Sequence, residues 1–472
     1  MGETKPGNGC PRCAELDARV ATLEAQLAAL QAQLAKALKH SGNSSKPPSS
    51  DIVKPPKKHR KPGRPKKRKI GGQPGHQRHL RTPFAPEELD RHWVWTYDEC
   101  PCCGGQLVDS DQSPRVLQQV ELLETPVRLE QHDSQPQWCS RCEKTFVPRF
   151  PEDLRQAGLA GPRLTALIGF FKGPCHMSYS SIRKYLRDVV GVTICRGMLR
   201  KLVGKVSDSL ETPYAALLAM LPKEGRLNVD ETGHKEKGQR LWTWCFRAYL
   251  YTVYKISPSR GSDVLVEVLG KEFDGLLGCD YFSAYRKYMR LNGNVLLQFC
   301  LAHLIRDVKF LVEHPDPKNQ VHGTRLLAGL RKLFGVIHRR ETYASEDTFR
   351  HALETVRDQL VWEATVESPH TREALALEER FYQHTESYFR FITEPAIEPT
   401  NNLAEHAMRF VAIHRRITQG TRSEGGRRWC ERIWTVIQTC GQQGRSVFEF
   451  LYAAVTAHFG SQPAPTLAPN TS

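Results

Sequence analysis

Three carboxylate side chains stand where two strands and a helix can bring them together. Asp230 ends an apolar run that begins at Leu227, and Asp280 ends a run that begins at Gly275, so both are predicted to close buried strands. Glu405 lies in a segment with helical periodicity and a basic face. Two strand-borne aspartates and a helix-borne glutamate can hold a pair of Mg²⁺ ions, about 3.5–4 Å apart in such sites. The chemistry that they indicate is metal-assisted phosphoryl transfer on nucleic acid.

The neighbours of these acids are more informative than their spacing. The chain has 51 Asp and Glu residues, and most single carboxylates are solvated surface groups, so some suggestive triple is expected by chance. The local motifs are specific. They read Val229-Asp-Glu-Thr, Cys279-Asp-Tyr-Phe-Ser-Ala-Tyr and Asn401-Asn-Leu-Ala-Glu.

These motifs resemble those of the insertion sequence 66 family transposases of bacterial mobile elements. The resemblance extends upstream to Gly42-Asn-Ser-Ser-Lys-Pro-Pro-Ser-Ser-Asp51 and Gly71-Gly-Gln-Pro-Gly-His76, so it covers nearly the whole chain. It implies a ribonuclease-H-like catalytic core, two magnesium ions held by Asp230, Asp280 and Glu405, and two small companion proteins encoded by the same element. The implied reaction is DNA cleavage by water at the ends of an insertion sequence, followed by attack of the freed 3′ hydroxyl on target DNA.

Two other functions stay open. A zinc-ribbon DNA-binding regulator on a catalytically decayed ribonuclease-H-like fold is disfavoured by the intact triad, and a nuclease on RNA or RNA·DNA hybrid would use the same site.

One residue departs from the family pattern, because His406 stands where an arginine commonly follows the glutamate. A phosphate contact there becomes pH-sensitive or absent. The neighbouring acids Glu231, Glu394 and Glu398 are expected to be bystanders.

The positive charge of the chain is concentrated in one short segment. The formal net charge is +16, and residues 41–81 contain 13 Lys or Arg and one Asp, which gives +12 of that total. Such a concentration indicates an arm that binds a polyanion, although a membrane-surface or localisation tract looks similar. Residues 54–69 are also rich in Pro, which predicts an extended, disordered arm. Within it, Pro62-Gly-Arg-Pro65 resembles an AT-hook core, with a purely electrostatic tether as the alternative.

Length and hydropathy predict a multidomain enzyme that is soluble. The chain has 472 residues and 40% hydrophobic content, enough for a sizeable core. No apolar run approaches the roughly 18 residues of a membrane span, and the polar N-terminus lacks a signal-peptide core. We therefore expect a cytoplasmic, nucleoid-associated protein with no membrane partner.

Four cysteines in two close pairs predict a structural zinc site. Cys100 and Cys103 form one pair, Cys139 and Cys142 form the other, and 35 residues separate them. Four thiolates in two such turns complete a closed tetrahedral site, which leaves no open position for catalysis. Cys102 lies within the first pair and could replace one ligand.

The N-terminal segment has the period of a coiled coil. Self-association is favoured over packing on the same chain, because the linker that follows cannot supply a core. The chain is therefore predicted to form a homo-oligomer. The seam runs for about three heptads through Leu16, Val20, Leu23, Leu27, Leu30, Leu34 and Ala37.

A helix-turn-helix-like pattern precedes the catalytic motifs. Residues 180–189 and 195–206 are predicted helices around a turn with Gly191, and the second helix is basic. Ordinary three-helix packing units imitate this pattern, and the zinc ribbon or the arm could carry base recognition instead. The residues expected to contact DNA are Lys57, Lys58, Arg60, Lys61, Arg64, Lys66, Lys67, Arg68, Lys69, Arg196, Arg200, Lys201, Arg409, Arg415 and Arg416.

The fold class predicted is multidomain α/β, with a ribonuclease-H-like core interrupted by a helical insertion. Strands are expected at 227–230, 242–248, 249–256, 275–280 and 295–299, with a helix at 262–269. Cys300 and His303 begin the next helix and could bind a metal, but packing or a phosphate contact is favoured. The expected domains are a coiled coil (1–40), a basic linker (41–90), a zinc ribbon (91–155), a helix-turn-helix-like region (156–220), the first part of the core (221–310), the insertion (311–395), the second part of the core (396–455) and a disordered tail (456–472).

Overall fold

A computed structural model describes residues 11–44, 83–90, 92, 94, 98, 102–106, 116–118, 127–139, 141, 144–394 and 397–469. The chain divides into one unit of residues 1–56 and 133–472 and a second of residues 57–132. The cationic residues expected to contact DNA between Lys57 and Lys69 lie outside the described residues, as do Cys100 and Cys142. In the second unit, Pro86–Glu88 forms a short 3-10 turn (η2), and the Gln118 amide pairs with the backbone of Phe84.

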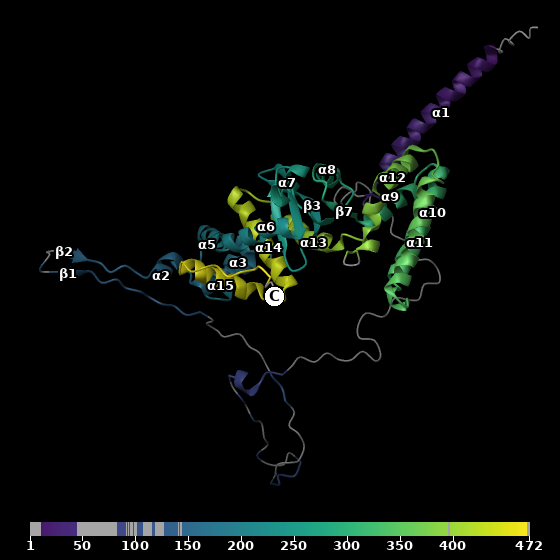
Figure 1. Ribbon diagram of the computed structural model, residues 1–472. Helices are drawn as coiled ribbons and strands as arrows, with labels where there is room; N and C mark the ends of the chain where they lie inside the picture. The colour runs from purple at the N-terminus through teal and green to yellow at the C-terminus, as the bar shows by residue number, and fades with distance from the viewer. Residues whose placement is uncertain are drawn as a thin grey trace, which may run out of the picture. The chain divides into compact units, whose positions relative to one another are not determined.

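A five-stranded mixed sheet forms the centre of the larger unit (Figure 1). Its spatial order is β5-β4-β3-β6-β7. The pairs β3–β4 and β4–β5 are antiparallel, whereas β3–β6 and β6–β7 are parallel. The strands are β3 (Arg226–Glu236), β4 (Gln239–Arg247), β5 (Thr252–Ser257), β6 (Leu276–Cys279) and β7 (Leu296–Phe299).

Local sequence explains the turn and the burial of these strands. Lys237 and Gly238 join β3 to β4 with φ angles of 49° and 86°, and two successive residues with positive φ suit a tight hairpin whose twist matches the strands. Residues 276–279 of β6 are all buried, as expected for a parallel strand covered on both faces.

The edge strand β5 is closed by a helix rather than left open. Helix α14 (Glu424–Gln442) presents Glu431, Thr435 and Thr439, which are spaced by four and lie on one helix face. These side chains accept hydrogen bonds from the backbone N–H groups of residues 256, 254 and 252 at 2.7, 3.1 and 3.2 Å. Because an unpaired sheet edge is a template for aggregation, this stripe both satisfies and protects β5.

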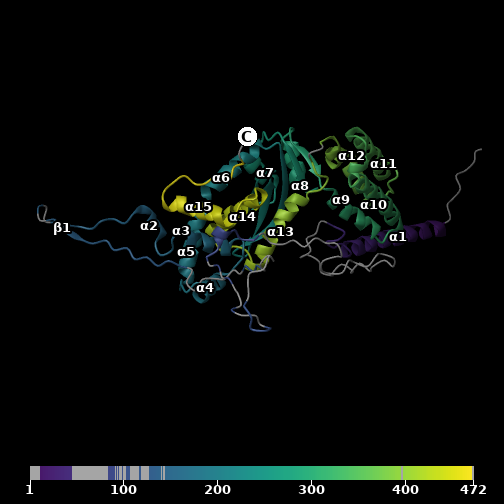
Figure 2. The same cartoon turned by 90° about the horizontal axis from the view of Figure 1, so that it is seen from below.

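Helix α13 (Asn402–Thr418) packs on β3 and β4, and α7 (Ser262–Leu269) packs against α8 (Ser283–Leu291). A helical bundle adjoins α14 on one side of the sheet, as both views show (Figure 1, Figure 2). Its central helices α3, α5 and α15 pack on one another. The bundle consists of α2 (Glu152–Ala157), α3 (Pro162–Lys172), α4 (Tyr179–Asp188), α5 (Arg196–Ser209), α6 (Glu211–Met220), with the 3-10 turn η3 (Leu221–Lys223), and α15 (Val447–Phe459).

A group of long helices lies beyond β7. The buried Gln298 on β7 ties it to the sheet, because its amide donates to the Tyr388 carbonyl at 3.1 Å and accepts from the Phe391 N–H at 2.9 Å. The interval expected to be a helical insertion is therefore helical and anchored at the sheet edge. The interval 311–395 contains α10 (Pro317–Ile337), η4 (Arg340–Thr342), α11 (Glu346–Thr365) and α12 (Arg372–Thr393). Helix α9 (Leu301–Val312), which packs on α10, begins before it, in the range expected for the first part of the core.

The N-terminal helix α1 (Pro11–Ala37) leaves its apolar seam exposed. The six leucine and valine side chains of the seam from Leu16 to Leu34 are 52–62% exposed in the single chain. Pairing of this seam with a second copy stays a prediction.

A separate hairpin joins β1 (Gln137–Cys139) to β2 (Lys144–Phe146). In the described part of the chain, no helix combines the length and the apolar character that crossing a membrane requires.

Candidate active site

Asp230 and Asp280 are neighbours because of the register between two parallel strands. Residues 226, 227 and 228 of β3 pair with residues 276, 277 and 278 of β6. Continuing that register by two residues places Asp230 beside Asp280, which directly follows the last residue of β6. Each carboxylate also accepts a hydrogen bond at 2.9 Å from a nearby backbone N–H, that of Glu231 for Asp230 and that of Phe282 for Asp280. Both side chains are thus held on rigid elements.

Glu405 reaches the same place from the first turn of α13. Burial, followed by the carboxylates of Glu231, Asp280 and Glu405, holds the pKa of Asp230 well above its usual range. Burial also raises the pKa of Asp280. Negative charges that destabilise one another in a half-buried site favour a bound cation, and carboxylate oxygens are the donors that Mg²⁺ prefers. The residues present therefore fit a magnesium centre, whose ligands would be Asp230, Asp280 and Glu405.

Asn401 positions α13 against the strands. Its amide donates to the Val229 carbonyl at 2.8 Å and accepts from the Asn228 amide at 2.9 Å, while its backbone N–H donates to Cys300 Sγ at 3.2 Å. One buried residue thus connects the helix that carries Glu405 to β3 and to the end of β7. The sequence motif contains Asn401, but its spacing alone did not indicate this role.

Gly278 allows this contact. A Cβ at this position would lie 2.5 Å from Asn228 Nδ2 and 3.7 Å from Asn401 Oδ1. Any larger residue would push apart the two asparagines that join α13 to the sheet. The glycine before Cys279 in the second motif therefore serves packing between elements rather than backbone conformation.

Glu231 is a second buried acid beside the centre, and it has partners of its own. Arg260 donates to Glu231 Oε1 from Nε at 2.9 Å and from Nη2 at 2.7 Å. The Tyr285 hydroxyl donates to Glu231 Oε2 at 2.5 Å. Burial and then Asp280 raise the pKa of Glu231 to about 7. The residue expected to be a bystander therefore lies within the electrostatic field of both aspartates.

Arg260 is held between two aromatic rings. Its guanidinium carbon lies 4.5 Å from the centre of the Trp242 ring and 3.9 Å from that of Phe282. Stacking on both faces fixes the plane of a guanidinium and strengthens its ion pair. No motif in the sequence pointed to Arg260, because its partners come from β3, from β4 and from the residue that precedes α8.

A cysteine and a histidine adjoin Glu405 on its other side. One ligand atom each of Cys300, His303 and Glu405 lie within 4.8 Å of one another, a spacing that could hold a metal ion. Arg306 contacts two of these three residues. Its Nη2 lies 3.0 Å from His303 Nε2 and donates to Glu405 Oε1 at 3.4 Å. Burial, then Arg306 and Arg380, lower the pKa of His303 to about 3, so the imidazole is neutral at pH 7.

The described cations expected to contact DNA divide into two groups. Arg196, Arg200 and Lys201 on α5 are exposed, and so are Arg409 and Arg416 on α13. Arg415 instead points at the sheet, where it donates to the Gly233 carbonyl and, at 3.2 Å, to Thr232 Oγ1. Its guanidinium joins α13 to β3, a role that a basic helical face in the sequence does not distinguish from DNA contact.

The predicted zinc ligands are only partly described. Cys103 is exposed and Cys139 is the last residue of β1, but nothing is described of the Cys139 side chain. Cys100 and Cys142 lie outside the described residues. The zinc site stays a prediction.

Comparison with known families identifies the relationship. The sequence profile of the family described as Transposase IS66 family matches residues 157–428, more than half of the chain. The chain belongs to this transposase family. The matched range contains all three acids of the IS66 motifs, and a further profile, described as a family of unknown function (DUF6444), matches residues 3–82.

Two curated relatives of this IS66 family member come from Sinorhizobium fredii (strain NBRC 101917 / NGR234), and both are described as uncharacterized proteins. Protein y4qI is 26% identical over 341 residues, which cover 66% of this chain and 62% of y4qI. Protein y4jD is 24% identical over 360 residues, which cover 71% of this chain and 70% of y4jD. The match thus spans less than two thirds of the length of y4qI.

Proposed function

We propose that this protein is a transposase that catalyses divalent-metal-dependent DNA cleavage and strand transfer at the ends of an insertion sequence. The observation that carries the proposal is the convergence of Asp230, Asp280 and Glu405 from β3, β6 and α13. Membership of the IS66 family supports the same activity. The rival function as a DNA-binding regulator does not need an aspartate, Asp230, whose pKa is raised by burial and by three neighbouring carboxylates.

The order of the strands supports a ribonuclease-H-like core. Three antiparallel strands come first in the chain, and two parallel strands then extend the sheet from the first of them, in the order β5-β4-β3-β6-β7. The two aspartates belong to the central strand β3 and to the end of its parallel neighbour β6. Asp230 stands two residues beyond the last pair between β3 and β6, so both aspartates lie where the parallel pairing ends. In open sheets, this is a common place for an active site.

Each acid then has a defined role. Asp230 and Asp280 provide ligands from adjacent strands, and Glu405 completes the set from α13. When bound, two magnesium ions supply the positive charge that stabilises the attacking and leaving oxygens of the phosphodiester. Glu231 binds Arg260 beside this centre. His303 stays neutral next to Glu405, so it adds no competing positive charge at pH 7.

DNA would be held by the basic arm and by exposed cations of the helices. Arg196, Arg200 and Lys201 face solvent on α5, a helix preceded by a turn with Gly191 at φ 77°. Arg409 lies one helical turn after Glu405 and is exposed, so it can address the same phosphate backbone. Long-range attraction to DNA comes from the arm, whose cations are concentrated in a few dozen residues.

The zinc site and the oligomer complete the proposal. We expect one zinc ion per chain at Cys100, Cys103, Cys139 and Cys142, which is supported by the β1–β2 hairpin around the second pair. Metal analysis of protein purified without chelators checks this, and a Cys139→Ser/Cys142→Ser variant should lose both zinc and local structure, because binding a structural zinc contributes on the order of 10 kcal/mol. The exposed α1 seam supports a homo-oligomer, with companion proteins of the same element as further partners.

A nicking assay tests the proposed activity. Full-length protein and magnesium should cut DNA that carries the element end and should leave a 3′ hydroxyl at the cut. A protein that binds this DNA but never cuts it with any divalent ion is a regulator, and one that cuts RNA or RNA·DNA hybrid in preference is a nuclease of the other class.

A further inference from the structure

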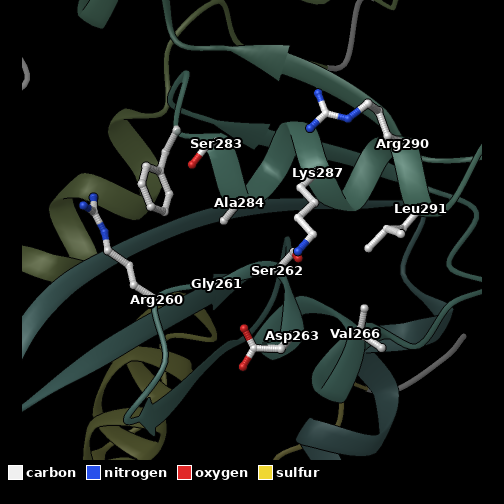
Figure 3. A pocket seen from close by; sticks show the side chains of 11 residues that line it. Arg260, Gly261, Ser262, Asp263, Val266, Ser283, Ala284, Lys287, Arg290 and Leu291 are labelled. Atoms are coloured by element: carbon white, nitrogen blue, oxygen red, sulfur yellow. The ribbon is translucent and has the colours of Figure 1, made fainter.

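A pocket of about 500 Å³ opens near the carboxylate centre, between the N-terminal half of α7 and the length of α8 (Figure 3). Its size lies within the usual range for sites that bind small organic groups. Among its lining residues are Arg260, Lys287 and Arg290, with Phe282 and Leu291 as apolar surfaces. Figure 3 shows the Lys287 side chain extending from α8 towards the first turn of α7.

The electrostatics of the pocket favour an anion. Lys287 and Arg290 are exposed and have no ion-pair partner in the described part of the chain. Arg260 uses Nε and Nη2 on Glu231, which leaves its Nη1 group for another acceptor. The one carboxylate among the lining residues, Asp263, accepts a hydrogen bond from Ser259 at 2.7 Å.

One helix end adds to this field. The residues that precede α7 and α8, Gly261 and Phe282, make no side-chain capping hydrogen bond. The first turn of α8 has no acid and keeps its partial positive charge, whereas Asp263 offsets that of α7. Three side-chain cations and the first turn of α8 around one cavity outweigh the single carboxylate of Asp263 and favour an anion there.

The pocket also offers a surface for an aromatic ring. Phe282 lies on its wall, and Val266, Ala284 and Leu291 add apolar contacts. A ligand that combines negative charge with a flat ring matches these features, which is the chemistry of a nucleotide. Inorganic phosphate alone would leave the apolar wall unused.

Two contacts connect the pocket to the carboxylate centre. Arg260 binds Glu231, the residue after Asp230, and the Phe282 N–H donates to Asp280 at 2.9 Å. The route from the aspartates to the pocket follows the connection between β6 and α8, in which Asp280 and Phe282 are two residues apart.

We propose that this pocket binds an unpaired nucleotide of the DNA strand beside the scissile phosphate, with its phosphate at Arg260, Lys287 and Arg290 and its base on Phe282. The inference rests on the proposed function, because it takes DNA as the ligand. A base outside the duplex must find a stacking partner and a charged cradle, and unpairing it costs a few kcal/mol unless the strand is already single. The pocket provides both.

The test measures binding of full-length protein to a fluorescent duplex with a short single-stranded overhang and to the same duplex with blunt ends, without divalent metal. Lys287→Ala/Arg290→Ala should lower the preference for the overhang about ten-fold and reduce its log–log salt slope by about 0.7 per lost phosphate contact. Phe282→Leu should weaken overhang binding and leave that slope unchanged, because it removes stacking but no charge. The matched control is Lys223→Ala/Lys271→Ala, which removes two exposed cations that do not line the pocket.

Equal binding of both duplexes by the wild-type protein would overturn the proposal, as would an equal loss in the control pair. Displacement of the overhang by a micromolar deoxynucleoside monophosphate would assign the pocket to free nucleotides instead. The readout is independent of cleavage. An overhang preference without any nicking would support the pocket and refute the proposed activity. Nicking without an overhang preference would support the activity and refute the pocket.

Discussion

The two halves of the carboxylate centre are held in place by different kinds of interaction. Asp230 and Asp280 are positioned by backbone hydrogen bonds between two parallel strands, whose register brings them side by side. Glu405 is positioned by side chains, chiefly by Asn401, whose amide contacts Val229 and Asn228. The strand half is therefore rigid by construction, and the helix half depends on a few replaceable contacts.

Because of this difference, substitutions can distinguish the loss of a metal ligand from the loss of a contact that positions a ligand. The ladder between β3 and β6 would survive replacement of any one side chain, so a substitution of either aspartate tests its charge alone. The helix half can fail in two ways, by loss of the Glu405 charge or by loss of the contacts that aim it. Substitutions on α13 and just before it should distinguish these two failures.

The largest effect is expected for the acids themselves. Asp230→Asn, Asp280→Asn and Glu405→Gln should each lower the rate of cleavage by about 1,000-fold or more, because an amide cannot replace the charge that holds two divalent ions. Folding and DNA binding should persist in all three, as checked by thermal unfolding and by gel shift. Cleavage by Glu405→Gln at the wild-type rate would show that α13 supplies no ligand.

A smaller loss is expected for the residue that aims Glu405. Asn401→Ala keeps every charge but removes two hydrogen bonds, each contributing about 0.5–1.5 kcal/mol. We expect cleavage to fall roughly ten- to hundred-fold, with a higher magnesium requirement and unchanged DNA affinity. Asn402→Ala, next to it and exposed, is the matched control and should behave as wild type. Equal defects in both variants would mean that Asn401 does not position the glutamate.

Glu231→Gln tests the acid between the two halves. Above pH 7, where Glu231 of the wild type is ionised, the neutral amide no longer balances Arg260, whose charge then favours the ionised Asp280 and competes with the metal. The magnesium requirement should therefore rise, and cleavage at fixed magnesium should fall about ten-fold. The exposed Glu398→Gln is the control of equal charge and should keep full activity.

The same variant has a predicted pH signature. Burial raises the pKa of Glu231 from its ordinary 4.5 to about 7, so the folded protein binds this proton more tightly than the unfolded chain. Its contribution to stability is present below pH 4.5 and is lost as pH rises to about 7. Without metal, the wild type should therefore lose stability as the pH rises from 4.5 to about 7, whereas Glu231→Gln should not. The melting temperature of the variant should rise relative to that of the wild type over this range. A constant difference across that range would contradict the burial argument.

The smallest effects distinguish two adjacent arginines on α13. Arg415→Ala should cost about 1–2 kcal/mol of stability, because its guanidinium bonds the Gly233 carbonyl and Thr232, and should barely change the salt dependence of DNA binding. Arg416→Ala should leave the melting temperature unchanged and reduce the log–log salt slope by about 0.9 if it contacts a phosphate. The reverse assignment would place the DNA on the other face of the helix.

Several elements could be predicted from the sequence because their signals are local. The apolar run at 275–280 contains β6, the predicted helix at 262–269 is α7, and the interval before the glutamate motif is helical. The run at 227–230 lies in β3, but this strand continues to Glu236, so Asp230 stands within it and does not close it. Short-range periodicity and turn residues carry these features, and each needs only its immediate neighbours in the chain. The family could also be predicted from the sequence, since each of its motifs is a contiguous run of residues.

The contacts around the acids were decided by the tertiary structure. Glu231 follows a catalytic candidate and reads as its bystander, yet it is buried against Arg260 and Tyr285 from two other elements. Arg415 reads as one more cation of a basic face, yet it binds β3. Which side chains meet depends on how α8 and α13 pack on the sheet.

The chain by itself thus determined which residue types are available for chemistry and which local elements carry them. Only the packed structure decided that Glu231 is a buried neighbour of these acids, which groups neutralise one another and where a pocket opens beside them. The physical reason is range. Propensity and periodicity act over a few residues, whereas burial, ion pairing and pKa shifts arise between groups that the chain separates by dozens to hundreds of positions.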